Sequence, residues 1–127
     1  MLTSHAPVLN TTCDTHGQMR AFLIDHLGFS FGSGDESGRF VLLWRDDLCV
    51  MLNCRGGLLN RLLRPWPRGI WSVYLWVKDV EALRAEFLER DVPLVRPDVV
   101  EKPYGCREIE VRCPDGRVLC FGELPSE

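Results

Sequence analysis

The chain has 127 residues, enough for one folded domain with a single hydrophobic core. Apolar residues make up 46% and charged residues 26% of it, as in ordinary globular proteins, and the net charge of −3 disfavours a nucleic-acid partner. No apolar run approaches the roughly 20 residues that a membrane helix needs, and the N-terminus lacks a signal-peptide core, so we expect no membrane partner and a cytoplasmic location.

The first half of the chain predicts a strand, a helix and a hairpin. Residues 8–14 favour a strand, and Asp14 at its end is expected to cap the following helix. Gly28 should end this helix, because glycine is favoured just beyond a helix C-terminus. Residues 33–38 predict a turn, before a hairpin of two strands at 40–44 and 48–52. The apolar positions of the helix are Met19, Phe22, Leu23 and Leu27.

Residues 55–70 are expected to form the connecting loop between the two halves of the chain. This segment carries four arginines and several leucines, which predicts a short helix or an ordered loop. Arginine-rich linkers are more often solvated than they are anion-binding sites.

The second half predicts a strand, a helix, an extended segment and a hairpin. Residues 72–77 are β-branched and aromatic, and Asp79 is a good N-cap for the helix that follows. A Pro-marked extended segment covers residues 92–99. The hairpin turns at 114–116, and its last strand should stop at Gly122. The apolar stripe of the helix is Val80, Leu83, Phe87 and Leu88.

The two halves are related by an internal repeat. Residues 8–14 align with residues 73–79 at an offset of 65 positions. A repeat near half of the chain length implies two similar units. We therefore predict a single domain over 1–127, with a first βαβββ unit at 5–54 and a second at 71–123.

Strand parity predicts which side chains of residues 72–77 face the helix. Alternate residues of a strand point to opposite faces, and the apolar set Val73, Leu75 and Val77 should lie under the helix. The other set should point to the opposite face of the sheet, and it consists of Ser72, Tyr74 and Trp76.

Several short segments resemble one protein family. They are FLIDHLGF at 22–29, VKDVEAL at 77–83, and PYGCRE at 103–108 followed by CPDGR at 113–117. These segments resemble the vicinal-oxygen-chelate superfamily, which includes dioxygenases, and within it the glyoxalase/bleomycin-resistance-like proteins. The resemblance implies an α+β fold of two βαβββ units that form a cleft-bearing mixed sheet.

The resemblance also implies where metal ligands would lie. The corresponding positions are Pro7, Ser72 and Cys120. Proline cannot ligate through its side chain, serine is a poor ligand for such metals, and one cysteine does not make a catalytic site. We therefore expect no metal and no cofactor. A shifted site would need His5 together with Glu108 or Glu110.

Catalytic residues cannot be assigned from the sequence. Glu108 and Glu110 share one strand face, which is more simply a solvated face than an acid–base pair. Cys106 has no histidine placed to act as its base. The six cysteines lack metal-site spacing and are expected to be reduced and structural.

The resemblance places a ligand-binding cleft on the uncovered sheet face. The predicted function is metal-independent binding of a small organic molecule, such as an antibiotic or an aromatic metabolite, by a homodimer. Such binding would give antibiotic resistance by capture. Alternatives are a metal-dependent lyase, isomerase, dioxygenase or thiol transferase with unusual ligands, and an interaction module without a small ligand. Arg107 and the arginine-rich linker argue against a cationic drug such as bleomycin. The predicted cleft residues are Trp44, Met51, Ser72, Tyr74, Trp76, Tyr104, Arg107 and Cys120.

Overall fold

The computed structural model describes residues 6–12, 14–54 and 73–124, which belong to two compact units. Each unit contains one four-stranded mixed sheet and one helical segment, so the predicted α+β class with two βαβββ units is confirmed. The predicted connecting loop at 55–70, together with His5 and Ser72, lies outside the described residues. None of the helices in the described ranges is long and apolar enough to cross a membrane.

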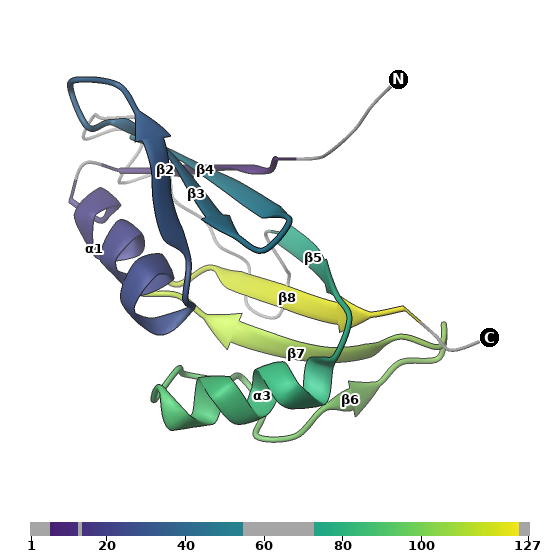
Figure 1. Ribbon diagram of the computed structural model, residues 1–127. Helices are drawn as coiled ribbons and strands as arrows, with labels where there is room; N and C mark the ends of the chain where they lie inside the picture. Colours follow the sequence, from purple (N-terminus) through teal and green to yellow (C-terminus); the bar gives the residue numbers. More distant parts are fainter. Residues whose placement is uncertain (1–5, 13, 55–72, 125–127) are drawn as a thin grey trace, which may run out of the picture. The chain divides into compact units, whose positions relative to one another are not determined.

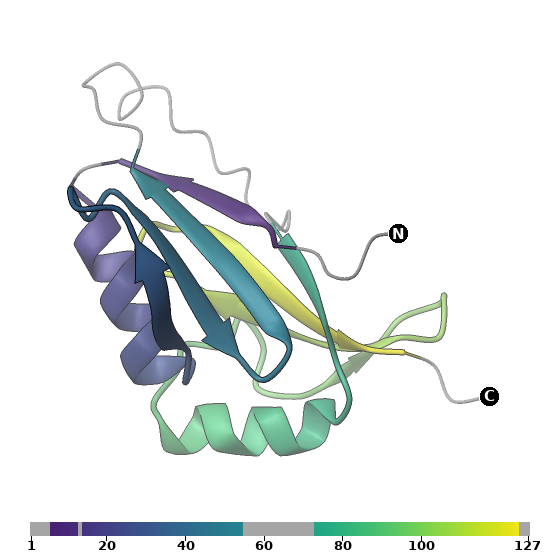
Figure 2. The same cartoon turned by 45° about the horizontal axis from the view of Figure 1, so that its top comes forward.

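The sheet of the first unit brings its first and last strands together. Its elements are β1 (Val8–Thr11), α1 (His16–Ala21), η1 (Phe22–His26), β2 (Ser30–Gly34), β3 (Phe40–Arg45) and β4 (Leu48–Cys54). The strand order is β1-β4-β3-β2, with β1 parallel to β4 and the other neighbours antiparallel (Figure 2). The predicted hairpin of β3 and β4 is confirmed, with Asp46 at φ 51° in its turn.

The helical segment of the first unit changes its winding halfway. After α1 the chain forms one turn of π-helix, η1, and Gly28 then ends the segment with φ 79° as predicted. The N-cap is Thr15 rather than Asp14, so the prediction for Asp14 was one residue too early. The predicted apolar positions Met19, Phe22, Leu23 and Leu27 are all buried.

Strand β2 was not predicted from the sequence, and β6 lies just beyond the extended segment predicted at 92–99. Strand β2 occupies Ser30–Gly34 and pairs with β3, so the expected turn at 33–38 begins later than predicted. All five of its residues are exposed, and its serines and glycines have low strand propensity. Its pairing with β3 therefore depends on backbone hydrogen bonds rather than on an apolar pattern.

The second unit repeats the same order of elements. It consists of β5 (Val73–Val77), α3 (Val80–Glu89), β6 (Val100–Glu101), β7 (Arg107–Arg112) and β8 (Val118–Glu123). The strand order is β5-β8-β7-β6, and β5 runs parallel to β8 (Figure 1). The repeat offset predicted from sequence is confirmed, since β1 starts at Val8 and β5 at Val73.

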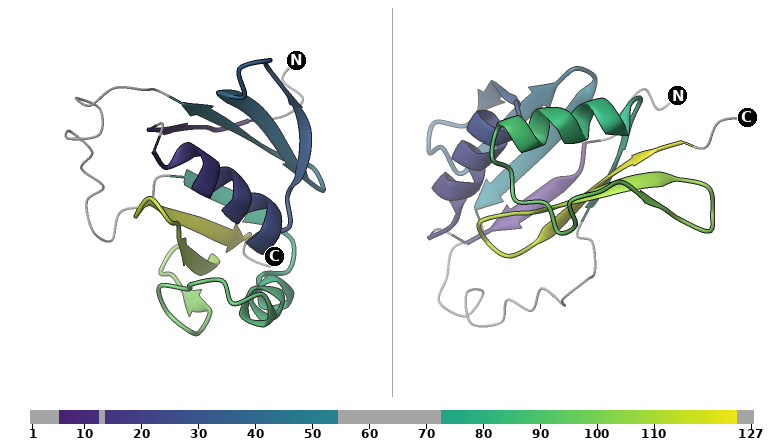
Figure 3. Two further views of the ribbon diagram at one scale, coloured as in Figure 1. Left: turned by 90° about the vertical axis from the view of Figure 1, so that its left-hand side faces the viewer. Right: turned by 90° about the horizontal axis from the view of Figure 1, so that it is seen from below.

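Helix α3 packs along one face of the second sheet, as the right-hand view of Figure 3 shows. The Asp79 carboxylate caps it by accepting from the Ala82 amide at 3.0 Å, as predicted. Phe87 is buried and meets Phe121 of β8 edge to face, with 5.4 Å between the ring centroids. Leu88 was predicted in the buried stripe but is 46% exposed, because its side chain points about 100° around the helix from Phe87.

Burial in β5 confirms the predicted strand parity. Leu75 is buried on the face that α3 covers, where Phe121 and Ile109 are its neighbours in the sheet. Trp76, the next residue along β5, is exposed. Gly122 was predicted to stop the last strand, but β8 continues through it to Glu123.

Candidate functional site

The face of the second sheet opposite α3 carries aromatic and acidic side chains in register. Tyr74 lies opposite Cys120, and Trp76 lies opposite Gly122 on the neighbouring strand. On the far side of β8, Gly122 lies opposite Glu108 of β7. Two tyrosines and one tryptophan therefore lie around the paired residues Glu108 and Gly122. We call this group the Glu108 cluster: Tyr74, Trp76, Tyr104, Glu108 and Gly122.

Two tyrosines converge on one oxygen of Glu108. The Tyr74 hydroxyl donates a hydrogen bond of 2.7 Å to Glu108 Oε2, and the Tyr104 hydroxyl donates to the same oxygen. Glu108 is only 1% exposed, so the prediction that it belongs to a solvated strand face was wrong. Its second oxygen, Oε1, is buried and has no hydrogen-bond partner within the described parts of the chain. A buried carboxylate oxygen without a donor is costly and therefore marks an unusual position.

Gly122 makes the approach of Tyr74 to Glu108 possible. Tyr74 starts opposite Cys120, so its ring must cross β8 over Gly122 to reach Glu108. A Cβ atom at Gly122 would lie 1.8 Å from the Tyr74 hydroxyl oxygen and 2.3 Å from its Cζ. Any side chain at this position would collide with the ring, so the absence of a Cβ at Gly122 is a requirement of the cluster.

Trp76 and Tyr104 give the cluster an accessible aromatic surface. The Trp76 ring meets the Tyr74 ring edge to face, with centroids 4.8 Å apart and an interplanar angle of 64°. Trp76 is 49% exposed and Tyr104 is 56% exposed. Large aromatic rings that remain half open next to a buried polar group are typical of ligand sites.

Burial and the charge of Glu108 keep the nearby acidic groups protonated. The pKa of Tyr74 is raised, and burial of its side chain is the largest cause. The hydrogen bond to Glu108 and the negative charge of Glu108 raise this pKa further. Desolvation of its hydroxyl and the same carboxylate also raise the pKa of Tyr104. Burial, followed by the charges of Glu108 and Glu110, raises the pKa of the Cys120 thiol. These groups are therefore hydrogen-bond donors rather than bases or nucleophiles near neutral pH.

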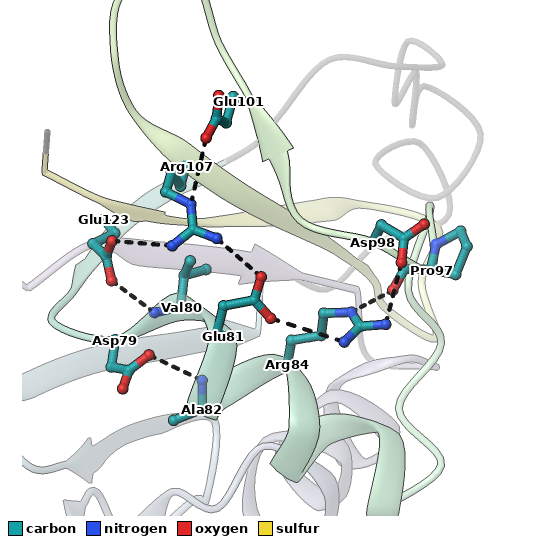
Figure 4. A network of polar contacts seen from close by, with 10 residues as sticks. All are labelled: Asp79, Val80, Glu81, Ala82, Arg84, Pro97, Asp98, Glu101, Arg107 and Glu123. Atoms are coloured by element: carbon teal, nitrogen blue, oxygen red, sulfur yellow. Dashed lines mark hydrogen bonds and ion pairs between the residues drawn. The ribbon is translucent and has the colours of Figure 1, made fainter.

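Arg107 does not belong to this face, although it was predicted as a cleft residue. It precedes Glu108 on β7, so its side chain points to the opposite face, which α3 covers. Figure 4 shows its guanidinium group among three carboxylates. The distances are 2.9 Å to Glu81, 3.7 Å to Glu123 and 4.0 Å to Glu101. Arg107 therefore ties α3 to the sheet.

The described cysteines are free thiols, in agreement with the prediction of reduced structural cysteines. Cys49, Cys106, Cys113 and Cys120 are buried, and Cys54 is partly buried. Cys120, predicted as a cleft residue, has no exposed surface and lies between Tyr74 and Glu110 in the register of the sheet.

Trp44 and Met51, the predicted cleft residues of the first unit, lie on the face of the first sheet opposite the buried residues Val41, Leu43 and Leu52. Met51 is paired with Leu42 and with Val8, and it is partly buried. Trp44 is 42% exposed, and its indole ring lies close to Gly32, where a Cβ would come within 2.5 Å of it. A glycine beneath an aromatic ring thus occurs in both units. Ser72 is not among the described residues.

Within the described ranges, no group of three or more His, Cys, Asp or Glu side chains could hold a metal ion. Cys120 and Glu110 are neighbours in the sheet, but two ligands do not complete such a site. Because His5 and Ser72 lie outside the described ranges, a metal-free protein remains a prediction.

Comparisons with known proteins give the fold its class. No family model matches the sequence, and no curated protein is significantly similar to it in sequence. Solved structures do match over nearly the whole chain, and the three named below share the fold of glyoxalase and bleomycin-binding proteins. The chain has this fold, as the resemblance in its sequence implied.

Three of the similar structures show the range of proteins with this fold. TnmS3, an antibiotic-binding protein from a Streptomyces species, has a TM-score of 0.68 and 22% identity, with 99% of each chain covered. The bleomycin-binding protein of Streptomyces verticillus, complexed with copper(II)-bleomycin, has a TM-score of 0.68 and 24% identity, covering 100% of this chain and 98% of that one. Lactoylglutathione lyase from Agrobacterium tumefaciens has a TM-score of 0.64 and 18% identity, covering 95% and 94%.

Proposed function

We propose that the protein binds a small organic molecule with an aromatic part, such as an antibiotic or an aromatic metabolite, and releases it unchanged. The observation that carries this proposal is the Glu108 cluster. It combines half-exposed aromatic rings with a buried carboxylate, which is the usual composition of a small-molecule site: mostly apolar walls and a few fixed polar groups.

The chemistry of the cluster supports binding rather than catalysis. The two phenols have raised pKa values and donate to Glu108, so neither is prepared to accept a proton from a substrate. The Cys120 thiol is buried and its pKa is raised, which disfavours the reactive thiolate. The antibiotic-binding proteins among the similar structures add support by analogy of fold, whereas the lyase among them shows that fold alone does not decide.

We further propose that binding needs no metal and that the protein forms a homodimer. The amino acids at the ligand positions implied by the resemblance favour metal independence, since Pro7 and Ser72 do not suit such metals. Sheet edges such as β1 and β2 favour pairing with another chain, because strand edges present backbone groups that need partners. The cytoplasmic location stays a prediction.

Calorimetric titration of the chelator-treated protein tests the proposal. The probes are copper(II)-bleomycin and 1-naphthalenemethanol, a flat neutral aromatic compound. We expect at least one of them to bind with one site per chain, and the compound recovered afterwards should be chemically unchanged. Binding should be lost or weakened in Trp76→Ala but retained in Trp44→Ala if the Glu108 cluster is the site.

Three results would contradict the proposal. They are the absence of heat from both probes, conversion of a bound probe to a product, and binding that appears only after a divalent metal is added. The Trp44→Ala protein serves as the matched control, because it removes an indole of similar exposure from the first unit.

A further inference from the structure

We propose that the ligand of the Glu108 cluster carries a protonated amine or a similar cationic N–H donor, which binds the free oxygen of Glu108. This inference rests on the proposed function, since it names the chemical class of the molecule that the same site takes. It follows from the unpaired oxygen, from the charges near it, and from the exposed aromatic rings.

The unpaired oxygen defines what is missing from the site. Both tyrosine hydroxyls donate to Oε2, which leaves Oε1 without a hydrogen-bond partner inside the described ranges although Glu108 is 1% exposed. The Cys120 thiol also makes a hydrogen bond to the Glu108 side chain, but an S–H group is a weak donor. An ammonium N–H donates a strong charge-assisted hydrogen bond to a carboxylate, so it would supply Oε1 with the strong donor that the described residues do not provide.

The charges around the carboxylate favour a cation over an anion. Glu110 lies two residues from Glu108 on the same strand and the same face. At Cys120, the charges of Glu108 and Glu110 both act more strongly than the opposing charge of Lys102. Arg112 is the other cation of this strand face, and it is exposed at the far end of β7. An anionic ligand would therefore meet net repulsion at Glu108.

The position of Arg107 removes an argument against a cationic ligand. Arg107 was predicted as a cation of the cleft, but it lies on the opposite face and is paired with Glu81, Glu101 and Glu123 (Figure 4). Its positive charge is therefore offset by these three carboxylates rather than directed at Glu108.

The aromatic rings suit the same class of molecule. Trp76 is half exposed beside Tyr74, and the face of an indole ring attracts a cation as well as stacking on an aromatic ring. Tyr104 is the most exposed member of the cluster and donates to Glu108 from the turn before β7. A ligand that approaches Glu108 would therefore displace the Tyr104 ring more easily than the other groups that contact the carboxylate.

Three naphthalene probes that differ in one group test the inference by calorimetry at pH 7. They are 1-naphthylmethylamine, which is protonated, neutral 1-naphthalenemethanol, and anionic 1-naphthoate. We expect the amine to bind at least tenfold more tightly than the alcohol, and the naphthoate to bind more weakly than the alcohol. Glu108→Gln should abolish the preference for the amine, because an amide has no negative charge to offer.

Glu110→Gln is the matched control, since it removes the same charge two residues along the same strand. It should reduce the preference for the amine less than threefold. Equal loss of the preference in both variants would overturn the assignment to Glu108. So would equal affinity of the wild-type protein for the amine and the alcohol, or tighter binding of the naphthoate.

A second variant covers the case in which Glu108→Gln does not fold. Tyr104→Phe removes one donor from the carboxylate and should increase the preference for the amine, whereas an unchanged or smaller preference would overturn the inference. The outcomes also separate the two proposals. Binding of the alcohol or naphthoate at the Trp76 site without a preference for the amine refutes this inference alone. Absence of binding by every probe, copper(II)-bleomycin included, refutes the proposed function as well.

Discussion

Replacing Gly122 with alanine tests whether Tyr74 really crosses β8 to reach Glu108. The new Cβ would lie 1.8 Å from the Tyr74 hydroxyl oxygen, and ordinary van der Waals contact begins at 3.4 Å. The hydroxyl must therefore move by about 1.6 Å, which breaks its 2.7 Å hydrogen bond to Glu108. The Cζ atom would be at 2.3 Å, so the whole ring has to leave rather than the hydroxyl alone.

The expected change in stability follows from two opposing effects. Loss of a hydrogen bond to a charged group costs about 1.5–3 kcal/mol of unfolding free energy. Alanine in place of glycine within a strand regains roughly 0.5–1 kcal/mol of conformational entropy. We therefore expect Gly122→Ala to lower the free energy of unfolding by about 1–2 kcal/mol, measured by urea unfolding with circular dichroism.

Making Gly122→Ala in a protein that already carries Tyr74→Ala shows how much of its effect comes from the collision with the tyrosine ring. Without the tyrosine ring, Gly122→Ala should be neutral or stabilising by roughly 0.5–1 kcal/mol, so the two substitutions should be strongly non-additive. A Gly122→Ala substitution that stabilises the wild-type protein, or that costs the same in both backgrounds, would refute the proposed path of Tyr74.

Four further predictions concern the cluster and the state of the protein. Trp76→Ala should weaken binding of an aromatic probe several-fold to tenfold or more and leave the fold intact, because stacking adds about 0.5–1.5 kcal/mol. By contrast, Leu75→Ala should lower the free energy of unfolding by about 2–5 kcal/mol, since Leu75 is buried beneath α3; the opposite pattern would show that the faces are inverted. The two tyrosines of the chain are both in the cluster, and their pKa values are raised, so absorbance at 295 nm should stay flat well above pH 10 in the folded protein. The contribution of the two tyrosines to the free energy of unfolding should accordingly be fully present below pH 10. It should fall as the pH rises further, because the tyrosines of the unfolded chain ionise first; a normal titration near pH 10 would contradict the assignment. Elemental analysis after mild purification should find no stoichiometric Zn, Ni, Mn or Fe, whereas about one metal per chain would defeat the metal-free proposal. Light scattering at micromolar concentration should give the mass of a dimer, and a monomer mass would count against it.

Local chemistry made much of the fold predictable. The cap at Asp79, the helix end at Gly28 and the turn at Gly116 depend on residues within a few positions, so each could be assigned from a short segment. The parity of β5 was predictable for the same reason, since alternation along a strand decides which residues lie under the helix. Strand β2 was missed because its Ser–Gly sequence carries neither an apolar pattern nor strand propensity.

The candidate site was only partly predictable, because its central residue depends on contacts that are distant in sequence. Tyr74 and Glu108 are 34 positions apart, and their hydrogen bond also requires a glycine at position 122. The alternating pattern around Glu108 indicates a strand but does not say which polar residues are buried. Arg107 was among the predicted cleft residues and Glu108 was not, although the two are neighbours on a strand and point to opposite faces. The register of β7 on β8, with Glu108 opposite Gly122, was the information needed.

The pairing of the first and last strands in each unit has a consequence for synthesis of the protein. Val8 of β1 pairs with Met51 of β4, and Val73 of β5 pairs with Leu119 of β8, so the paired residues are 43 and 46 positions apart. At roughly 5–20 residues per second, a ribosome needs roughly 2–9 s to deliver the second strand of each pair. During that interval the apolar residues of α1 and η1 lack the strand that completes their core. The time for which each unit remains without its complete sheet during synthesis is therefore determined by the late position of β4 and β8.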